Sequence, residues 1–177
     1  LLGDGSAPPA ALLMIGLARL PDIIKSMGHA LGDRLMREAG ARLQALAGDQ
    51  PLARAGDAQF LLWLPAAGRA EAINLAFRVR DALGQPFVAE DASLDVAPAV
   101  GIALSPQHGA QAGALLQHAE VALFAALGLE DPVAVYSPEE DPNRPERLAL
   151  MGELRQAIDG NLLEVHYQPR LDLRSGR

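Results

Sequence analysis

Residues 51–64, Pro-Leu-Ala-Arg-Ala-Gly-Asp-Ala-Gln-Phe-Leu-Leu-Trp-Leu, have the pattern of a β-hairpin. We expect one strand at 51–54 and a second, richer in large apolar residues, at 59–64. Between them lies Gly56-Asp57, and such a pair between two strand-like runs is a tight-turn signal. The hairpin predicts an antiparallel sheet, and the segments on either side of it decide what packs on that sheet.

Helical and extended patterns alternate on both sides of the hairpin. Upstream, residues 11–17 form a continuous apolar run, which is typical of a strand buried on both faces. Two helices are expected between that strand and the hairpin, a short one that begins at Pro21 and another that begins at Gly32-Asp33. Downstream, the patterns predict helices at 68–83 and 112–127 and strands at 87–88, 94–104 and 133–136. This order predicts an α+β fold, an α/β sandwich with a mainly antiparallel central sheet flanked by helices and a ferredoxin-like core.

Composition narrows the classes of function. The chain has 177 residues, of which 50% are hydrophobic, so it can bury a real core. Its net charge is -7 and no run of Lys or Arg is visible, which argues against nucleic-acid or membrane contact. The longest apolar run, residues 10–18, is shorter than the ~20 residues of a membrane span. The chain has no Cys, and its four His are dispersed without metal-ligand spacing, so we expect a cytoplasmic protein.

Three short motifs resemble those of a known family. They are Met-Gly-His-Ala-Leu-Gly-Asp-Arg-Leu at 27–35, Arg-Ala-Gly-Asp-Ala-Gln-Phe at 54–60, and Tyr-Gln-Pro at 167–169 after the helical Glu-Leu-Arg-Gln-Ala at 153–157. Together they resemble a GGDEF domain, the diguanylate-cyclase-like domain with a nucleotide-cyclase palm, followed by the opening of an EAL domain. The resemblance implies a role in bacterial cyclic-di-GMP signal transduction.

The resemblance and the composition together predict the domain organisation. Residues 1–10 are expected to be a disordered lead-in, and 11–137 the GGDEF domain. Residues 138–160 are expected to hold a linker and an amphipathic helix, and 161–177 the start of a truncated EAL domain with a strand at 162–169. The chain lacks an initiator Met and stops in a turn-like sequence, so we expect a piece of a longer protein.

The family's chemistry depends on carboxylates that are missing here. Joining two GTP molecules is phosphoryl transfer, which relies on divalent metals, and magnesium prefers carboxylate oxygen. The resemblance places one metal-binding Asp at the end of the first strand and two acids in the turn. Those positions are Gly16, Ala58 and Gln59. We therefore expect a degenerate domain, a pseudo-enzyme with no catalytic residue, no bound metal and no cofactor.

The nucleotide contacts that the resemblance implies are depleted as well. The guanine-reading Asn corresponds to Ile24 and the phosphate-contacting Lys to Pro21, and the Lys expected just after the last helix corresponds to Leu127. Of the guanine pair Asp33 remains, although an Asp there could equally serve as the N-cap of the following helix. The family's inhibitory product site corresponds to Ala47 and Gln50, so it is also expected to be lost.

The turn keeps two residues of a vestigial nucleotide site, Gly56 and Asp57. Asp57 either shapes the turn, since Asp tolerates turn conformations, or supplies a metal ligand from a shifted position. Together with Asp33, these are the vestigial nucleotide-binding residues that we expect.

Three functions follow as hypotheses. The first is a regulatory or dimerisation module. Its expected partners are its own EAL domain, a phosphodiesterase or receptor, and, in a homodimer, a second copy. Cyclic-di-GMP would then bind through the EAL domain only, where Gln168 matches a dinucleotide-contacting position. The second is an allosteric GTP-binding module. The third is an RNA-binding sheet, which the low aromatic content and acidic charge count against.

Overall fold

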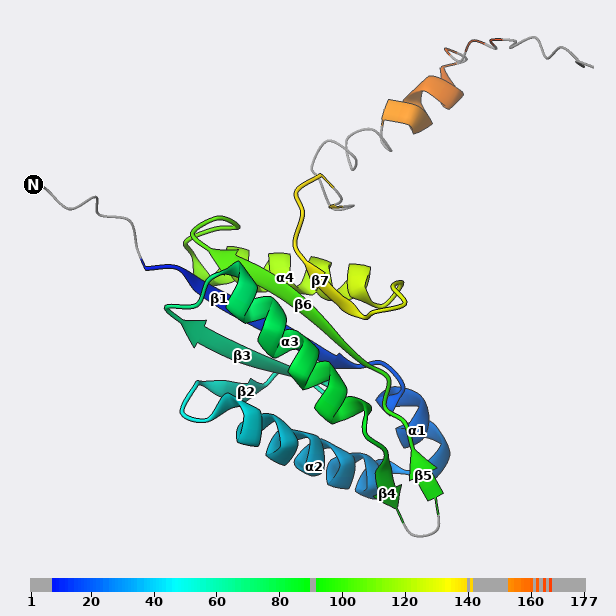
Figure 1. The fold of residues 1–177 in the computed structure, drawn as a ribbon. Helices are drawn as coiled ribbons and strands as arrows, with labels where there is room; N and C mark the ends of the chain where they lie inside the picture. Colours follow the sequence, from blue (N-terminus) through cyan, green and yellow to red (C-terminus); the bar gives the residue numbers. More distant parts are fainter. Residues whose placement is uncertain are drawn as a thin grey trace, which may run out of the picture. The chain divides into compact units, whose positions relative to one another are not determined.

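The computed structural model describes residues 8–89, 92–139, 141, 153–160, 162, 164 and 166. The chain divides into two compact units, Leu1–Glu140 and Asp141–Arg177. The first unit holds every strand discussed below and is drawn from blue to yellow in Figure 1.

Helices and strands follow one another in the first unit in the predicted order, with one extra strand. Their bounds are β1 Ala10–Leu17, α1 Leu20–Met27, α2 His29–Ala47, β2 Leu52–Arg54, β3 Gln59–Pro65, α3 Arg69–Gly84, β4 Phe87–Ala89, β5 Ala92–Leu94, β6 Pro98–Ser105, α4 Ala112–Ala126 and β7 Val133–Val135. The hairpin that dominated the sequence pattern is β2–β3, with Leu52 opposite Leu62 and Arg54 opposite Phe60.

The central sheet has five strands in the order β2-β3-β1-β6-β7. Neighbouring strands are antiparallel, except that β7 runs parallel to β6. Strands β4 and β5 form a separate two-stranded ribbon. The α+β class and the mainly antiparallel sheet flanked by helices are therefore confirmed.

Helices cover the sheet from both faces, as Figure 1 shows with α3 crossing one face and α4 lying behind the other. Successive residues of a strand point to opposite faces. Thus Ile15 belongs to the larger core that includes residues of α2 and α3, whereas Met14 packs with Ala119 and Leu123 of α4. A Cβ at Gly101 would lie 2.2 Å from the carbonyl oxygen of Ala119, so this glycine allows α4 to lie directly on β6.

The second helix begins earlier than expected. It starts at His29, with Gly28 as its N-cap at φ +89°, so the predicted start at Gly32-Asp33 is wrong. Glycine adopts this left-handed φ without steric cost, which lets the chain turn directly from α1 into α2. Asp33 therefore lies inside the helix and does not cap it.

The long strand expected at 94–104 is two strands. It is interrupted at 95–97, where Ala97 has φ +48° and its N–H donates to the Asp95 carboxylate at 2.8 Å. The N–H of Arg19 donates a hydrogen bond to the carbonyl oxygen of Val96, and the N–H of Ala18 donates to that of Ala97, each at 3.1 Å. These contacts replace a continuous ladder, so β5 pairs with β4 and β6 pairs with β1.

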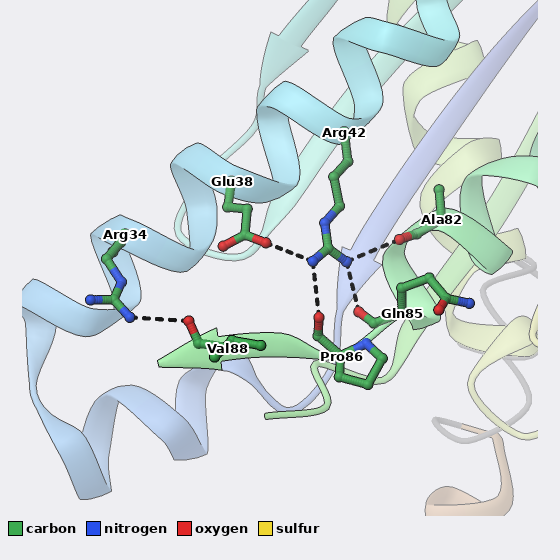
Figure 2. Close-up of polar contacts among 7 residues, drawn as sticks. All are labelled: Arg34, Glu38, Arg42, Ala82, Gln85, Pro86 and Val88. Atoms are coloured by element: carbon green, nitrogen blue, oxygen red, sulfur yellow. Dashed lines mark hydrogen bonds and ion pairs between the residues drawn. The ribbon is translucent and has the colours of Figure 1, made fainter. Parts of the chain in front are cut away.

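One arginine joins α2 to the end of α3 and to β4 (Figure 2). The Arg42 guanidinium donates to the carbonyl oxygens of Ala82, Gln85 and Pro86 at 3.1, 2.6 and 3.0 Å. It also pairs with Glu38 at 2.6 Å and lies 3.8 Å from the centre of the Phe87 ring. Carbonyls at a helix C-terminus lack partners within the helix, so Arg42 satisfies groups that would otherwise need water.

The second unit is described only in part. Residues 153–159 are helical, which agrees with the expected helix where it is described. Residues 162, 164 and 166 are not in a strand, so the strand predicted at 162–169 is not found at these positions, and the remainder lies outside the described residues. Among the described residues, no helix combines the length and the apolar character that crossing a membrane requires.

Candidate functional site

The sheet register brings the three expected carboxylate positions together. Gly16, at the end of β1, pairs with Gln59 of β3 on one side and with Ala99 of β6 on the other. The next residue, Leu17, donates its N–H to the carbonyl oxygen of Ala58 at 2.9 Å. Positions 16, 58 and 59 are therefore immediate neighbours, and none of them carries a carboxylate.

A leucine fills the space in front of Gly16. A Cβ built on Gly16 would lie 3.1 Å from one methyl carbon of Leu123 and 3.3 Å from the other. Leu123 comes from α4 and is only 3% exposed. An aspartate at position 16 would therefore require Leu123 to move, and the surroundings of Gly16 are those of a packed core.

The position that corresponds to the guanine-reading residue is also closed by an apolar contact. Ile24 of α1 lies on Gly32 of α2, so closely that a Cβ on Gly32 would meet Cγ1 of Ile24 at 2.4 Å. Ile24 is half-buried and packs on the main core. Asp33, the neighbouring residue, is exposed, and its backbone carbonyl accepts a hydrogen bond from Arg37 at 3.3 Å.

The hairpin turn is shaped by its backbone. Gly56 has φ +74°, and its carbonyl accepts a hydrogen bond from Nε of Arg54 at 2.9 Å. Asp57 is exposed at the tip. Within the part of the chain that the structure describes, no group of three or more His, Asp or Glu side chains is arranged to hold a metal ion.

A hollow of about 730 Å³ lies beside the end of β1 and the start of β6. Leu127, which stands where the resemblance implies a Lys just after the last helix, lines it together with Ala18 and Ala99. Pro21, which stands where the resemblance implies a phosphate-contacting Lys, is exposed in the first turn of α1.

Acidic side chains dominate the charged lining of the hollow. Asp81, Asp95 and Glu130 contribute carboxylates, and the lining cation, Arg80, is paired with Asp81 at 2.6 Å and Asp131 at 2.7 Å. Asp95 is in turn paired with Arg19 at 2.7 Å, so the hollow keeps an excess of carboxylates and no unpaired cation among its lining residues. Sequence reasoning missed these acids because they come from three separate segments and no local motif links them.

The two positions that the resemblance assigns to an inhibitory product site, Ala47 and Gln50, also lie together. Ala47 and Gln50 line a hollow of about 420 Å³ with Glu71 and Arg78 of α3. Ala47 is buried, and Gln50 is half-buried. Arg78 is a cation that the sequence reasoning did not single out, since it lies 28 positions beyond Gln50 and only the α2–α3 packing brings the two together. Gln168 lies outside the described residues.

Comparison with known proteins identifies the family of this domain. The model of the family "Diguanylate cyclase, GGDEF domain" matches residues 4–128. The chain is 32% identical over 165 residues to the cyclic di-GMP phosphodiesterase PdeR of Escherichia coli, which covers 92% of this chain and 25% of that protein. It is 29% identical over 163 residues to the bifunctional diguanylate cyclase/cyclic di-GMP phosphodiesterase MucR of Pseudomonas aeruginosa. This alignment covers 91% of this chain and 24% of MucR. The chain thus spans about a quarter of the length of these relatives.

Solved structures share the fold. An EAL/GGDEF domain protein from M. capsulatus superposes with a TM-score of 0.68 at 29% identity, over 77% of this chain and 88% of that one. The GGDEF domain of YfiN from Pseudomonas aeruginosa gives a TM-score of 0.69 at 26% identity, over 73% and 83%. Residues 4–128, which the family model matches, include β1, the β2–β3 hairpin and α4, the elements that carry the candidate site. The chain belongs to the diguanylate cyclase GGDEF domain family.

Proposed function

We propose that this GGDEF domain does not synthesise cyclic di-GMP and instead serves as a regulatory or dimerisation module for an EAL domain that follows it. One observation carries the proposal: Gly16, Ala58 and Gln59 are brought side by side by the sheet register, and no carboxylate stands among them. This arrangement supports the proposal, because the three positions that the resemblance assigns to metal-binding carboxylates lie together and carry none.

The physical argument concerns the metal ions of phosphoryl transfer. Magnesium is held through hard oxygen ligands, usually carboxylates together with substrate phosphates, and it offsets the charge that develops in the transition state. An alanine and a glycine provide no side-chain ligand, and a neutral glutamine provides no charge to attract the ion. Asp57 is at the exposed tip of the turn, so the shifted-ligand hypothesis gains no support from its surroundings.

The packing also disfavours the alternative of a GTP-binding allosteric module. Ile24 occupies the face of Gly32, where a guanine edge would need polar partners. Burying the edge of a base against an isoleucine would leave its donors and acceptors unpaired, at a cost of about 1–3 kcal/mol each. The hollow beside Leu127 also offers a triphosphate an excess of carboxylates and no unpaired cation among its lining residues.

The aromatic side chains of the central sheet do not favour the RNA-binding hypothesis. Recognition of single-stranded RNA on a sheet needs exposed aromatic side chains on which bases stack. Phe60 of β3 is buried in the main core, and Trp63 is half-buried against the residues that pack on α4.

The coupling to an EAL domain is supported by the relatives and by the sequence beyond residue 128. The alignment with PdeR, named a cyclic di-GMP phosphodiesterase, covers 92% of this chain, whereas the family model ends at residue 128. We propose that residues 161–177 begin an EAL domain and that Gln168 contacts cyclic di-GMP there. The module would then act in the cytoplasm through its own EAL domain and, in a homodimer, through a second copy.

The purified chain tests the loss of catalysis and of nucleotide binding. Incubated with GTP and Mg²⁺ or Mn²⁺, it is expected to form no cyclic di-GMP by chromatography, while an active diguanylate cyclase in the same assay confirms detection. Calorimetric titration with GTP and Mg²⁺ is expected to show no saturation below millimolar concentration. Product formation would contradict the loss of catalysis, and saturable binding without product would favour the allosteric alternative.

A gain-of-function variant tests whether the missing carboxylates are the whole defect. We expect Gly16→Asp/Ala58→Glu/Gln59→Glu, which restores all three carboxylates, to remain inactive, because Leu123 still fills the space before position 16 and Ile24 still covers Gly32. Cyclic di-GMP synthesis by this triple variant would show that the nucleotide contacts are intact and that only the metal ligands were lost.

A further inference from the structure

Three aromatic rings meet where the last strand of the sheet ends. His108 comes from the loop between β6 and α4, His118 from α4, and Tyr136 directly follows β7. The His118 ring is stacked on the Tyr136 ring, with centres 4.0 Å apart and planes 20° apart. The His108 ring meets the edge of Tyr136 at 5.3 Å. The proposed GGDEF function uses none of these residues.

His108 is held in one protonation state by a backbone contact. Its Nδ1 accepts a hydrogen bond from the Leu104 N–H at 3.0 Å, and the His108 N–H donates to the Leu104 carbonyl at 2.7 Å. The residue is only 5% exposed. A ring nitrogen that accepts a hydrogen bond cannot carry a proton, so His108 must be neutral with its proton on Nε2.

His118 contacts both the loop that carries His108 and the ring of Tyr136. Its Nδ1 lies 2.5 Å from the His108 carbonyl oxygen, a contact in which Nδ1–H donates. Because the same ring stacks on Tyr136, the His108 loop, α4 and the residue after β7 form one connected group. Tyr136 is also buried against Val121 and Ala122 of α4, and its N–H donates to the Ile102 carbonyl at 2.8 Å.

We propose that His108, His118 and Tyr136 form a protonation-sensitive latch that holds the end of β7 on the sheet while His108 is neutral and loosens it when His108 is protonated. Protonation puts a hydrogen on Nδ1, so the Leu104 N–H loses its acceptor and two donors face each other in a buried site. The loop that carries the His108 carbonyl must then move, and His118 and Tyr136 lose their fixed positions. This inference does not depend on the proposed loss of catalysis.

The charges around His108 set the direction of the switch. His118 faces it from α4, Arg69 lies at the start of α3, and the phenol of Tyr136 faces it from the end of β7. Glu139, the carboxylate nearest to Tyr136 in the sequence, accepts a hydrogen bond from the Ser137 hydroxyl at 2.7 Å. Burial, then His118 and Arg69, lower the pKa of His108 below its ordinary value. The neutral, latched form is therefore favoured at neutral pH, and acid opens the latch.

The position of the latch gives it a consequence for the following segment. Strand β7 has three residues, lies at the edge of the sheet and pairs only with β6 among the described strands. Such a short edge strand has few ladder hydrogen bonds, so the contacts of Tyr136 add to the packing of Val133 and Val135 on the main core in fixing its position. Opening the latch would loosen the point from which the chain continues beyond the domain.

Amide hydrogen exchange followed by NMR between pH 8 and 5 tests the latch. After correction for the intrinsic rate, the protection of the Leu104 and Tyr136 amides is expected to be constant above the ordinary His pKa of about 6.5. Below it, protection should fall about tenfold per pH unit until His108 is protonated in the folded state. The Phe60 amide in β3 is expected to show no such pH dependence. Constant protection at Leu104 and Tyr136 throughout would overturn the proposal.

Variants identify the titrating group. In His108→Asn an amide oxygen replaces Nδ1 as acceptor and cannot titrate, so the pH dependence is expected to vanish, whereas His29→Asn, at an exposed histidine of α2, retains it. Persistence of the pH dependence in His108→Asn contradicts the proposal. If that variant does not fold, the unmodified protein decides. The fall in protection of the two amides must level off at the pH where the His108 ring titrates in the folded state, and a fall that levels off at a clearly different pH would refute the latch.

Discussion

The two halves of α2 differ in what their side chains do. The first half carries the positions that resemble a nucleotide site, and there Gly32 is covered by Ile24 and Asp33 is exposed. The second half carries Arg42, which bonds three carbonyl oxygens and Glu38 (Figure 2). The contacts of Arg42 thus join α2 to α3 and β4, whereas Ile24, at the position that corresponds to the guanine-reading residue, packs on the first half of α2. This difference is consistent with the proposed regulatory or dimerisation module, which depends on the shape of the domain and not on nucleotide contacts.

Arg42→Ala is expected to have the largest effect, because it breaks the polar contacts of the second half of α2. Removing the guanidinium leaves Glu38 and the carbonyls at the end of α3 without this partner, and hydrogen bonds of a charged group contribute about 1.5–3 kcal/mol. We expect the free energy of unfolding in urea to fall by about 2–3 kcal/mol.

Two further variants serve as controls for Arg42→Ala. Arg42→Lys keeps the charge without the planar set of donors, so it should lie between the wild type and alanine. Arg37→Ala removes an exposed arginine of the same helix and should change stability by less than about 0.5 kcal/mol. Equal effects of Arg37→Ala and Arg42→Ala would show that the contacts in Figure 2 are not what distinguishes the second half of α2.

Gly32→Ala examines the apolar contact that closes the first half. Alanine favours a helix over glycine by about 1 kcal/mol, but its Cβ would meet Cγ1 of Ile24 at 2.4 Å, and overpacking costs about 1–3 kcal/mol. We expect a net loss of about 1 kcal/mol in urea unfolding. In an Ile24→Ala background the same substitution should instead stabilise the protein. A gain in both backgrounds would mean that Ile24 does not cover Gly32.

Much of this fold could be predicted because its elements follow local periodicity. The buried run of β1, the β2–β3 hairpin and the register of apolar residues in α4 are readable in short windows. The start of α2 was mispredicted because Gly28 caps it through backbone geometry, where sequence reasoning looks for a polar cap such as Asp33. The break before β6 depends on Asp95, whose carboxylate also pairs with Arg19 at 2.7 Å across 76 positions of sequence.

The candidate site could likewise be predicted only in part from the sequence. The resemblance identified Gly16, Ala58 and Gln59, and the sheet register explains why they are neighbours. What fills the site could not be predicted, because the contacts of Leu123 with Gly16 and of Ile24 with Gly32 depend on the packing of α4 and α1. Packing of this kind is set by the whole fold, and no spacing along the chain indicates it.

Asp33→Ala is expected to have the smallest effect and addresses the polar residue of the first half of α2 that matches the family's guanine pair. An N-cap aspartate contributes about 0.5–2 kcal/mol, but Asp33 lies inside the helix, which begins at His29. Because its side chain is exposed, we expect a change in unfolding free energy of less than about 0.5 kcal/mol, measured in urea, with no change in GTP titration. A matched substitution at exposed Asp49, beyond the end of α2, gives the background for losing one surface charge. A loss above about 1 kcal/mol would restore the capping role. Saturable GTP binding that disappears in Asp33→Ala would instead show that the first half of α2 still recognises a nucleotide.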